Sequence, residues 1–245
     1  MTVKIGFLDI ETAPNLGYSW GKYDQNIISF VETWFLLAFS YKFLGEDKIV
    51  TKALPDYPKY KKNKKDDSDL VKDLWKFFNE ADIIVAHNGD NFDTKKSNAR
   101  FITHGLPPPK PYKTVDTLKI ARKHFKFDGN RLADLAQYLE VGSKEKTFGF
   151  ATWEGCIKGD PIEWKRMRVY NAKDITLLEG VYLKLRPWAA THPDLSLYSH
   201  PGNCHVCDST RVQRRGVMHL KTRSYQRLNC QSCGAWFRGD YVKRT

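Results

Sequence analysis

The chain has 245 residues, enough for one sizeable hydrophobic core and a small additional unit. No apolar run approaches the roughly 20 residues needed to cross a membrane, and the N-terminus has no signal-peptide layout, so we expect a cytoplasmic protein without a membrane partner. The formal net charge of +12 favours a polyanionic partner.

The positive charge is concentrated near the C-terminus. Residues 200–245 contain nine Lys and Arg side chains against Asp208 and Asp240, which gives a net charge of +7. Four of the five cysteines lie in the same segment, whereas Cys156 stands alone and is interpreted as a buried or incidental thiol. Because nothing indicates export, metal binding is a better interpretation of the paired cysteines than disulfides.

The first predicted element is a central strand over residues 3–11, because apolar residues occupy both of its faces. Side chains alternate along a strand, so Asp9 and Glu11 leave the same face. Two ionised carboxylates at the edge of a core repel each other and lose hydration, so they persist only with a counter-charge, usually a divalent cation. A solvated acidic turn is the alternative for this pair taken alone.

The rest of the chain is predicted to alternate strands and helices. Residues 12–33 are expected to be irregular. Strands are expected over 34–44, 48–54, 82–88 and 113–116, and helices over 68–81, 92–104, 117–123, 131–140 and 161–186. Loops are expected over 56–67, which is basic and either solvated or in contact with nucleic acid, and over 141–160. This order predicts an α/β fold with a mixed sheet and helices on both faces.

The helix predicted over residues 161–186 carries an acid in its apolar stripe. The stripe passes through Met167, Tyr170, Asp174 and Leu178 at steps of three and four. A buried Asp is costly unless it is paired or binds a metal. Tyr170 lies one turn before Asp174, so its hydroxyl can reach that carboxylate. An ordinary core tyrosine and a partly exposed Asp174 are the alternatives.

Polar residues also follow the strand predicted over residues 82–88. Asn88 ends this strand, and Phe92 and Asp93 precede the next helix, where Asp93 is alternatively a plain N-cap or first-turn acid. Open α/β sheets build their sites beyond the carboxyl ends of their strands. We therefore expect the Asn88–Asp93 stretch to lie near Asp9.

The chain therefore contains three motifs in a fixed order: Asp9-x-Glu11, then Asn88-x-x-x-Phe92-Asp93, then Tyr170-x-x-x-Asp174. In this order they resemble the motifs of the DEDD (DnaQ-like) superfamily of 3′–5′ exonucleases. The resemblance covers residues 1–190 and is to the tyrosine branch, which includes the proofreading domains of family B DNA polymerases. The segment 131–136 is also similar to that family. The other branch has a histidine five residues before the last Asp, where this chain has Val169.

The resemblance implies a ribonuclease H-like fold and hydrolysis of phosphodiester bonds with two divalent ions. Asp9 would bridge both ions, and Glu11 and Asp174 would complete the site that activates water. Asp93 would hold the second ion through water, and Tyr170 would orient the attacking water. Oxygen ligands favour Mg²⁺ or Mn²⁺ at this site.

Further contacts to the terminal nucleotide are expected from Phe92, Asn88 and the backbone around Ile10. His87 is interpreted as a strand-end residue with satisfied hydrogen bonds rather than as a ligand. Trp153 could stack on unpaired bases, although core packing is the preferred interpretation.

The four C-terminal cysteines form a strong metal signature. Cys204-x-x-Cys207 and Cys230-x-x-Cys233 are separated by 22 residues and offer four thiolates to one structural, tetrahedral Zn²⁺. With short strands expected over 211–218 and 225–229, the segment resembles a zinc ribbon. A segment this small has too little core to fold alone, so the metal is expected to stabilise it.

The predicted ribbon also carries aromatic residues among its basic ones, namely Tyr225, Trp236, Phe237 and Tyr241. Cations interspersed with aromatic rings favour nucleic-acid binding. The alternative is a scaffold that docks a protein partner in replication, repair or processing.

The sequence thus predicts a two-domain nuclease. Residues 1–190 would form a 3′–5′ exonuclease domain for single-stranded DNA or RNA, residues 191–201 a linker, and residues 202–245 a zinc ribbon that grips the substrate. The alternatives are a structure-specific endonuclease of the same fold and a nucleic-acid-binding adaptor without catalysis. A transcription-type zinc-ribbon factor would leave the first 190 residues unexplained. The origin expected for such a chain is a phage or a bacterium.

Overall fold

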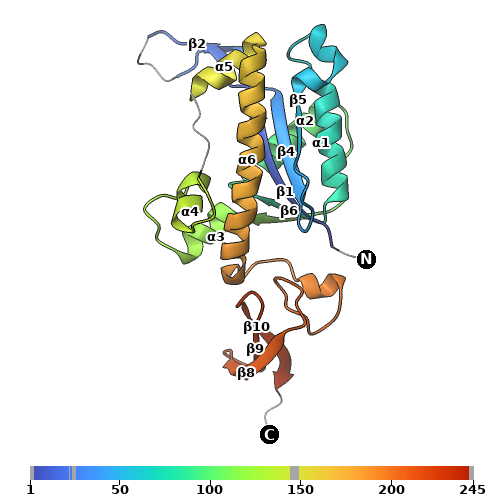
Figure 1. The fold of residues 1–245 in the computed structure, drawn as a ribbon, viewed down its shortest axis with the longest axis vertical. Coiled ribbons are helices and arrows are strands. Elements are labelled where there is room, and N and C mark those ends of the chain that lie inside the picture. Colours follow the sequence, from blue (N-terminus) through green and yellow to red (C-terminus); the bar gives the residue numbers. More distant parts are fainter. Residues whose placement is uncertain (1–2, 22, 24–25, 144–148, 243–245) are drawn as a thin grey trace.

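A five-stranded mixed sheet forms the centre of the larger part of the molecule (Figure 1). Strand β1 (Ile5–Thr12) lies in its middle, antiparallel to β4 (Leu36–Phe43) and parallel to β6 (Ile83–Ala86). Strands β5 (Val50–Ala53) and β7 (Lys113–Asp116) form the two edges. The computed structural model describes residues 3–21, 23, 26–143 and 149–242.

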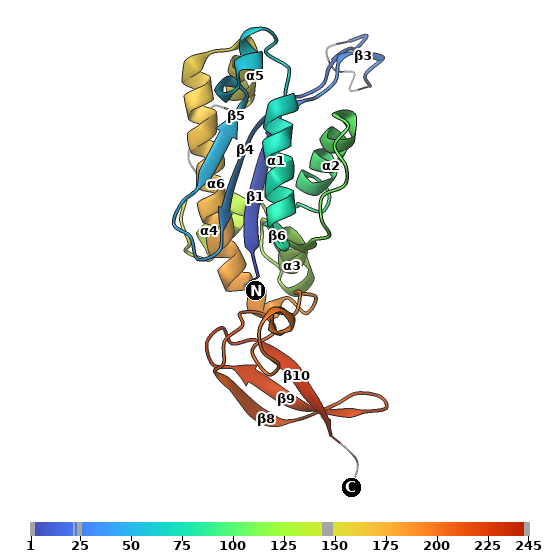
Figure 2. The ribbon, with the colours of Figure 1, turned by 90° about the vertical axis from the view of Figure 1, so that its right-hand side faces the viewer.

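Helices cover both faces of this sheet (Figures 1 and 2). Helices α1 (Ser68–Glu80) and α2 (Asp93–Thr103) contribute to the core on one face. Helices α3 (Thr117–His124), α4 (Leu132–Tyr138) and the long α6 (Pro161–Leu185) contribute to the core on the other. The α/β architecture predicted from the sequence is confirmed.

Strand β1 is buried on both faces because its alternate side chains enter these two cores. Phe7 packs edge-on against Tyr182 of α6, with ring centroids 5.5 Å apart, whereas Leu8 belongs to the core on the α1 side. A Cβ atom at Gly6 would lie 2.7 Å from the ring of Phe77, so a glycine lets α1 approach β1 closely. Asp9 shares the face of Phe7 and is therefore directed towards α6.

A buried ion pair fixes the end of the basic loop predicted over residues 56–67. Asp67 is fully buried and accepts hydrogen bonds from the Leu36 backbone N–H and from Nε of Arg100, both at 2.8 Å. His104 Nε2 lies 2.7 Å from the same carboxylate. This aspartate therefore joins β4, α1 and α2. The sequence analysis did not identify it, because it lies at the end of a polar loop.

Two segments differ from the prediction. Residues 12–33, expected to be irregular, contain a hairpin of β2 (Leu16–Tyr18) and β3 (Ser29–Glu32), whose apolar side chains are largely exposed. The loop expected over residues 141–160 contains helix α5 (Phe150–Lys158), and residues 144–148 of that loop lie outside the described residues. The short 3₁₀ turns are Leu54–Asp56, Pro58–Lys61, Arg186–Trp188 and Leu195–Tyr198.

The C-terminal part, which begins at residue 202 and which we call the ribbon, lies beyond the C-terminal end of α6 (Figures 1 and 2). It contains an antiparallel sheet of β8 (Val212–His219), β9 (Ser224–Cys230) and β10 (Trp236–Val242), with β9 in the middle. The sequence predicted the first two strands and missed β10. Its small core contains Cys204, Val206, Cys230 and Ala235.

Candidate active site

Three carboxylates meet where β1 passes the middle of α6. Asp9 and Glu11 come from β1 and Asp174 comes from α6, and each offers an oxygen within 4.8 Å of the other two. Asp174 is buried, and the other two are half-buried. The structure therefore brings together the two most widely separated acidic motifs of the sequence.

Asn171, which the sequence analysis did not single out, holds Asp9 in place. Its Nδ2 donates to Oδ2 of Asp9 at 2.5 Å and lies 3.2 Å from the Asp9 carbonyl oxygen. Asn171 is fully buried, whereas Tyr170 is half-buried. A signal was present, because Met167, Asn171 and Asp174 follow steps of four and three and so continue the buried stripe better than Tyr170 does.

Tyr170 lies beside the acids and faces them with its hydroxyl. It is hydrogen-bonded to Asp174, and its ring packs edge-on against Trp153 of α5 at 5.8 Å. Burial, together with the negative charges of Asp174 and Glu11, raises the pKa of Tyr170 well above its usual range. The phenol is thus a hydrogen-bond donor at every ordinary pH, and Trp153 supports its ring, as expected for core packing.

Asp93 occupies a position next to this cluster but is not one of its three members. It is buried at the start of α2, and its Oδ1 accepts a hydrogen bond from the Ile10 backbone N–H at 3.1 Å. Burial raises the pKa of the Asp93 carboxyl above its usual range. This contact joins the second acidic motif to the backbone between Asp9 and Glu11.

A second buried aspartate, Asp116 at the end of β7, organises the turn before Asp93. Asp116 accepts hydrogen bonds from the backbone N–H groups of Asn88 and Leu118 at 3.0 Å. Asn88 has a positive φ of 64°, a conformation that Asn tolerates better than most residues. No pattern in the sequence marks Asp116 beyond its position at the end of a strand.

His87 has both ring nitrogens engaged, as the sequence analysis expected. Its Nε2 donates to the Asn130 carbonyl oxygen at 2.9 Å, and its Nδ1 lies 2.9 Å from the Thr117 hydroxyl.

The four acids of the predicted motifs line one open cleft of about 550 Å³. Phe92 also lines the cleft with part of its ring exposed, whereas the Ile10 side chain is buried and only its backbone is suited to contact a ligand. Two arginines, Arg122 of α3 and Arg131 before α4, lie in the same lining. The remaining lining residues are Asp9, Glu11, His87, Asn88, Asp93, Leu118, Asn130, Leu132, Tyr170 and Asp174.

The chemistry of the three-carboxylate cluster fits a divalent metal. Carboxylates that share so small a volume raise one another's pKa unless a cation compensates their charge. Hard oxygen donors of this kind are the ligands that Mg²⁺ and Mn²⁺ take in proteins.

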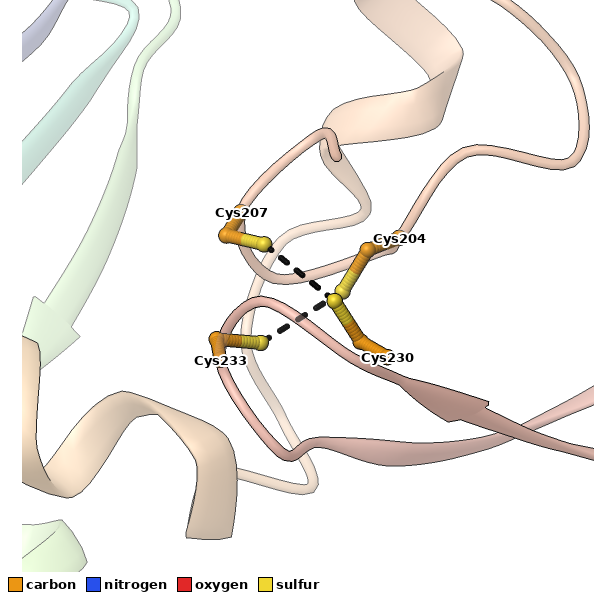
Figure 3. Close-up of side chains that lie close together, drawn as sticks. All are labelled: Cys204, Cys207, Cys230 and Cys233. Carbon is orange, nitrogen blue, oxygen red and sulfur yellow. Dashed lines mark hydrogen bonds between the residues drawn. The ribbon is translucent and has the colours of Figure 1, made fainter. Parts of the chain in front are cut away.

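The four C-terminal cysteines fit a tetrahedral zinc site (Figure 3). The sulfur atoms of Cys204 and Cys233 lie 3.7 Å apart, and those of Cys207 and Cys230 lie 3.6 Å apart. A tetrahedron with Zn–S bonds of about 2.3 Å requires S···S separations of about 3.8 Å. Burial raises the pKa of the Cys204 thiol to about 11, so a thiolate at this position needs a cation beside it.

Comparison with protein families agrees with the ribonuclease H-like fold expected from the motifs. The family model described as RNase_H superfamily matches residues 32–186, which is more than half of the chain and extends from β3 to the end of α6.

Two DNA polymerases are among the individual proteins that are similar to this chain. The chain is 32% identical over 104 residues to a PolC-type DNA polymerase III of Ureaplasma parvum, a match that covers 42% of this chain and 7% of that protein. The solved structure of a family B DNA polymerase from the archaeon Pyrobaculum calidifontis matches 76% of this chain and 25% of that chain, with a TM-score of 0.56 and 17% identity. This chain therefore spans a small part of each polymerase.

Proposed function

This chain belongs to the RNase_H superfamily, and from that premise we propose that it is a metal-dependent 3′–5′ exonuclease acting on single-stranded DNA or RNA. The observation that carries the proposal is the meeting of Asp9, Glu11 and Asp174 in one cleft, with Tyr170 hydrogen-bonded to Asp174. Both relatives described above are named as DNA polymerases. The order of the acidic motifs resembles that of the proofreading exonucleases.

The proposal assigns the metal to the clustered acids. Asp9, Glu11 and Asp174 would bind the ions directly, and Asp93, fixed by the Ile10 N–H, would hold a second ion through water. Divalent ions at such a site activate water and neutralise the charge of the scissile phosphate. Asn171 keeps Asp9 in the orientation that binding requires.

The other groups position the reactants. The Tyr170 hydroxyl, which stays protonated, orients the attacking water beside Asp174. Phe92 offers its partly exposed ring to the terminal base, and Asn88 lies beside it in the lining. Arg122 and Arg131 add positive charge to the same cleft, where it favours the phosphodiester backbone.

We also propose that residues 191–201 link two domains and that the ribbon binds one Zn²⁺ and holds the substrate. The concentration of positive charge in residues 200–245 supports this role. Among the described residues, none of the helices is both long and apolar enough to serve as a membrane span.

The test uses 5′-labelled single-stranded DNA and RNA of one sequence, with Mg²⁺ or Mn²⁺ and with EDTA. We expect a ladder that shortens from the 3′ end, that requires metal and that disappears in Asp9→Ala. Asp90→Asn is the matched control, since Asp90 lies in the turn that precedes Asp93 but forms an ion pair with Lys119. Large fragments at early times would indicate an endonuclease, and intact substrate in every lane would indicate an adaptor without catalysis.

A further inference from the structure

The sheet of the ribbon has one face that carries rings and guanidinium groups in alternation. The strand register places Arg238 opposite Arg227, Trp236 opposite Asn229 and Tyr241 opposite Tyr225, so these six side chains leave the same face. We call this surface the outer face of the ribbon. Trp236 and Tyr241 are 55% and 52% exposed, so their rings are accessible to a ligand.

The opposite face of the same sheet belongs to the zinc site. Cys230 is buried in the small core, and Val212 and Phe237 pack against that core. Phe237 also lies over His205, with ring centroids 4.4 Å apart. Phe237 is thus part of the ribbon's structure, and the aromatic residues available for recognition are those of the outer face.

On the outer face each cation is paired with a ring. The Arg227 guanidinium lies 5.3 Å from the Trp236 ring centroid, and the Arg238 guanidinium lies 5.2 Å from that of Tyr225. The Tyr225 and Tyr241 rings meet edge-on at 6.0 Å. These contacts hold the rings and cations in a fixed array before any ligand arrives, which lowers the ordering cost of binding.

The positive charges on this face favour the binding of an anion. Like charges placed directly opposite each other on neighbouring strands destabilise a sheet, and Arg227 and Arg238 occupy such a pair. The sole acid of β8, β9 and β10 is Asp240, at the irregularity in the β9–β10 pairing. A ligand that brings negative charge between the two arginines would remove this repulsion.

We propose that the outer face of the ribbon binds single-stranded nucleic acid, with bases stacked on Trp236 and on the Tyr225–Tyr241 pair, and with phosphates at Arg227 and Arg238. Exposed rings stack on bases that are unpaired, and stacking on such platforms tolerates any sequence. A duplex hides its base faces, so it would engage the arginines and leave the rings unused. The role of this strand as the substrate rests on the proposed exonuclease function, whereas its binding does not.

The position of the ribbon sets the length of strand that can occupy both places. Asp174 lies eleven residues before Leu185, the last residue of α6, which corresponds to about 16 Å along the helix axis. The ribbon begins beyond that end (Figure 1). A strand whose 3′ end is in the cleft must therefore extend over several nucleotides before it reaches the outer face, so only longer substrates benefit from the ribbon.

The test measures binding of fluorescent 20-nucleotide single strands, DNA and RNA, by anisotropy, with the full chain carrying Asp9→Ala and no added Mg²⁺. Trp236→Ala should weaken binding about tenfold, the usual cost of removing one stacking platform, and Trp236→Phe should retain most of the affinity. The double change Arg227→Ala/Arg238→Ala should weaken binding about tenfold as well. It should lower the salt dependence of log K by about 0.7 for each phosphate that an arginine no longer neutralises.

Arg214→Ala is the matched control for charge, because Arg214 pairs with Leu228 and so lies on the other face. It should change the affinity less than about twofold, since it leaves the array of rings and cations intact. Zinc content is measured for every variant. If Trp236→Ala loses zinc, the arginine pair, which lies outside the zinc core, still decides the question.

Three results would overturn the proposal. The first is wild-type affinity in both outer-face variants with zinc retained, which would leave the face to a protein partner. The second is duplex binding as tight as single-strand binding. The third is an equal loss of affinity in Arg214→Ala. Because no step needs hydrolysis, these results are independent of whether the protein proves to be an exonuclease.

Discussion

The two parts of this molecule are stabilised by different means. The α/β part has two extensive apolar cores, one on each side of a sheet whose central strand is buried on both faces. The ribbon has four residues in its core, and two of them are cysteines of the proposed zinc site. Burial of apolar surface can account for the first fold, whereas we expect the second to require a bound metal. The acids of the α/β part can therefore serve chemistry, while the cysteines of the ribbon serve structure.

Removal of zinc should produce the largest difference in stability between the two parts. Structural zinc contributes about 10–16 kcal/mol of apparent binding free energy in small zinc domains, so Cys230→Ser should abolish the fold of the ribbon and leave the α/β part folded. Hydrogen exchange would show that protection disappears in β8–β10 and is unchanged in β1 and β4. Cys156→Ser, which changes the buried thiol of α5, is the control. Protection of the ribbon from hydrogen exchange in the absence of zinc would contradict the conclusion that the two parts are stabilised by different means.

Within the α/β part, the buried Asp67 should matter for stability and not for chemistry. Asp67→Asn leaves the Arg100 guanidinium without its ion pair, and breaking a buried pair costs about 3–5 kcal/mol. Urea unfolding would measure this decrease in stability. Asp69→Asn, two residues away, breaks an exposed pair with Lys59 and should change stability little. Equal effects of the two changes would show that Asp67 does not fasten β4 to α2.

Substitution of a clustered acid should lower activity without lowering stability, the reverse of the effect expected for Asp67→Asn. Asp174→Asn should lower the rate of hydrolysis by roughly 10²–10³-fold, the scale of removing one electrostatic group from a site. In EDTA it should raise the melting temperature slightly, because it removes one of three mutually repelling carboxylates. Calorimetry and the gel assay measure the two effects. A fall in melting temperature together with full activity would make the cluster structural.

Asn171 should have the smallest of these effects, because it acts through Asp9. Groups that orient a metal ligand typically change metal affinity by 10–100-fold, so Asn171→Ala should raise the Mn²⁺ concentration needed for half-maximal activity by about that factor. Activity at saturating Mn²⁺ should largely recover. Asn98→Ala, in the middle of α2 and outside the lining of the cleft, is the control. An unchanged Mn²⁺ requirement would show that the hydrogen bond to Asp9 has no role in binding the metal.

The parts of the fold that the sequence predicted are those with continuous patterns. Strand β1 has an unbroken apolar run, α6 has a long stripe of apolar residues, and the cysteine pairs have a characteristic spacing. The hairpin β2–β3 was missed because its apolar side chains are exposed on both faces, so no alternation marks it. Helix α5 was missed because glycine and aromatic residues in and around it indicated a loop.

The polar residues that were missed have a common cause. Asp67, Asp116 and Asn171 are all buried, and each forms hydrogen bonds with a distant part of the chain. A sequence shows which residues are polar but not which of them are enclosed by tertiary structure. The acidic motifs could be identified from the sequence because they lie at the end of a buried strand and on a buried stripe. Their proximity could be inferred from topology.

The most direct test of the exonuclease proposal follows the first product released from a 3′-labelled single strand. In the presence of Mn²⁺ we predict that the label appears as a 5′-mononucleotide from the earliest time point, and that EDTA or Asp9→Ala abolishes it. A trinucleotide substrate should be cut equally well by wild type and by Trp236→Ala, because it is too short to reach the ribbon. Label released first in longer fragments, or mononucleotide release that persists in Asp9→Ala, would contradict the account.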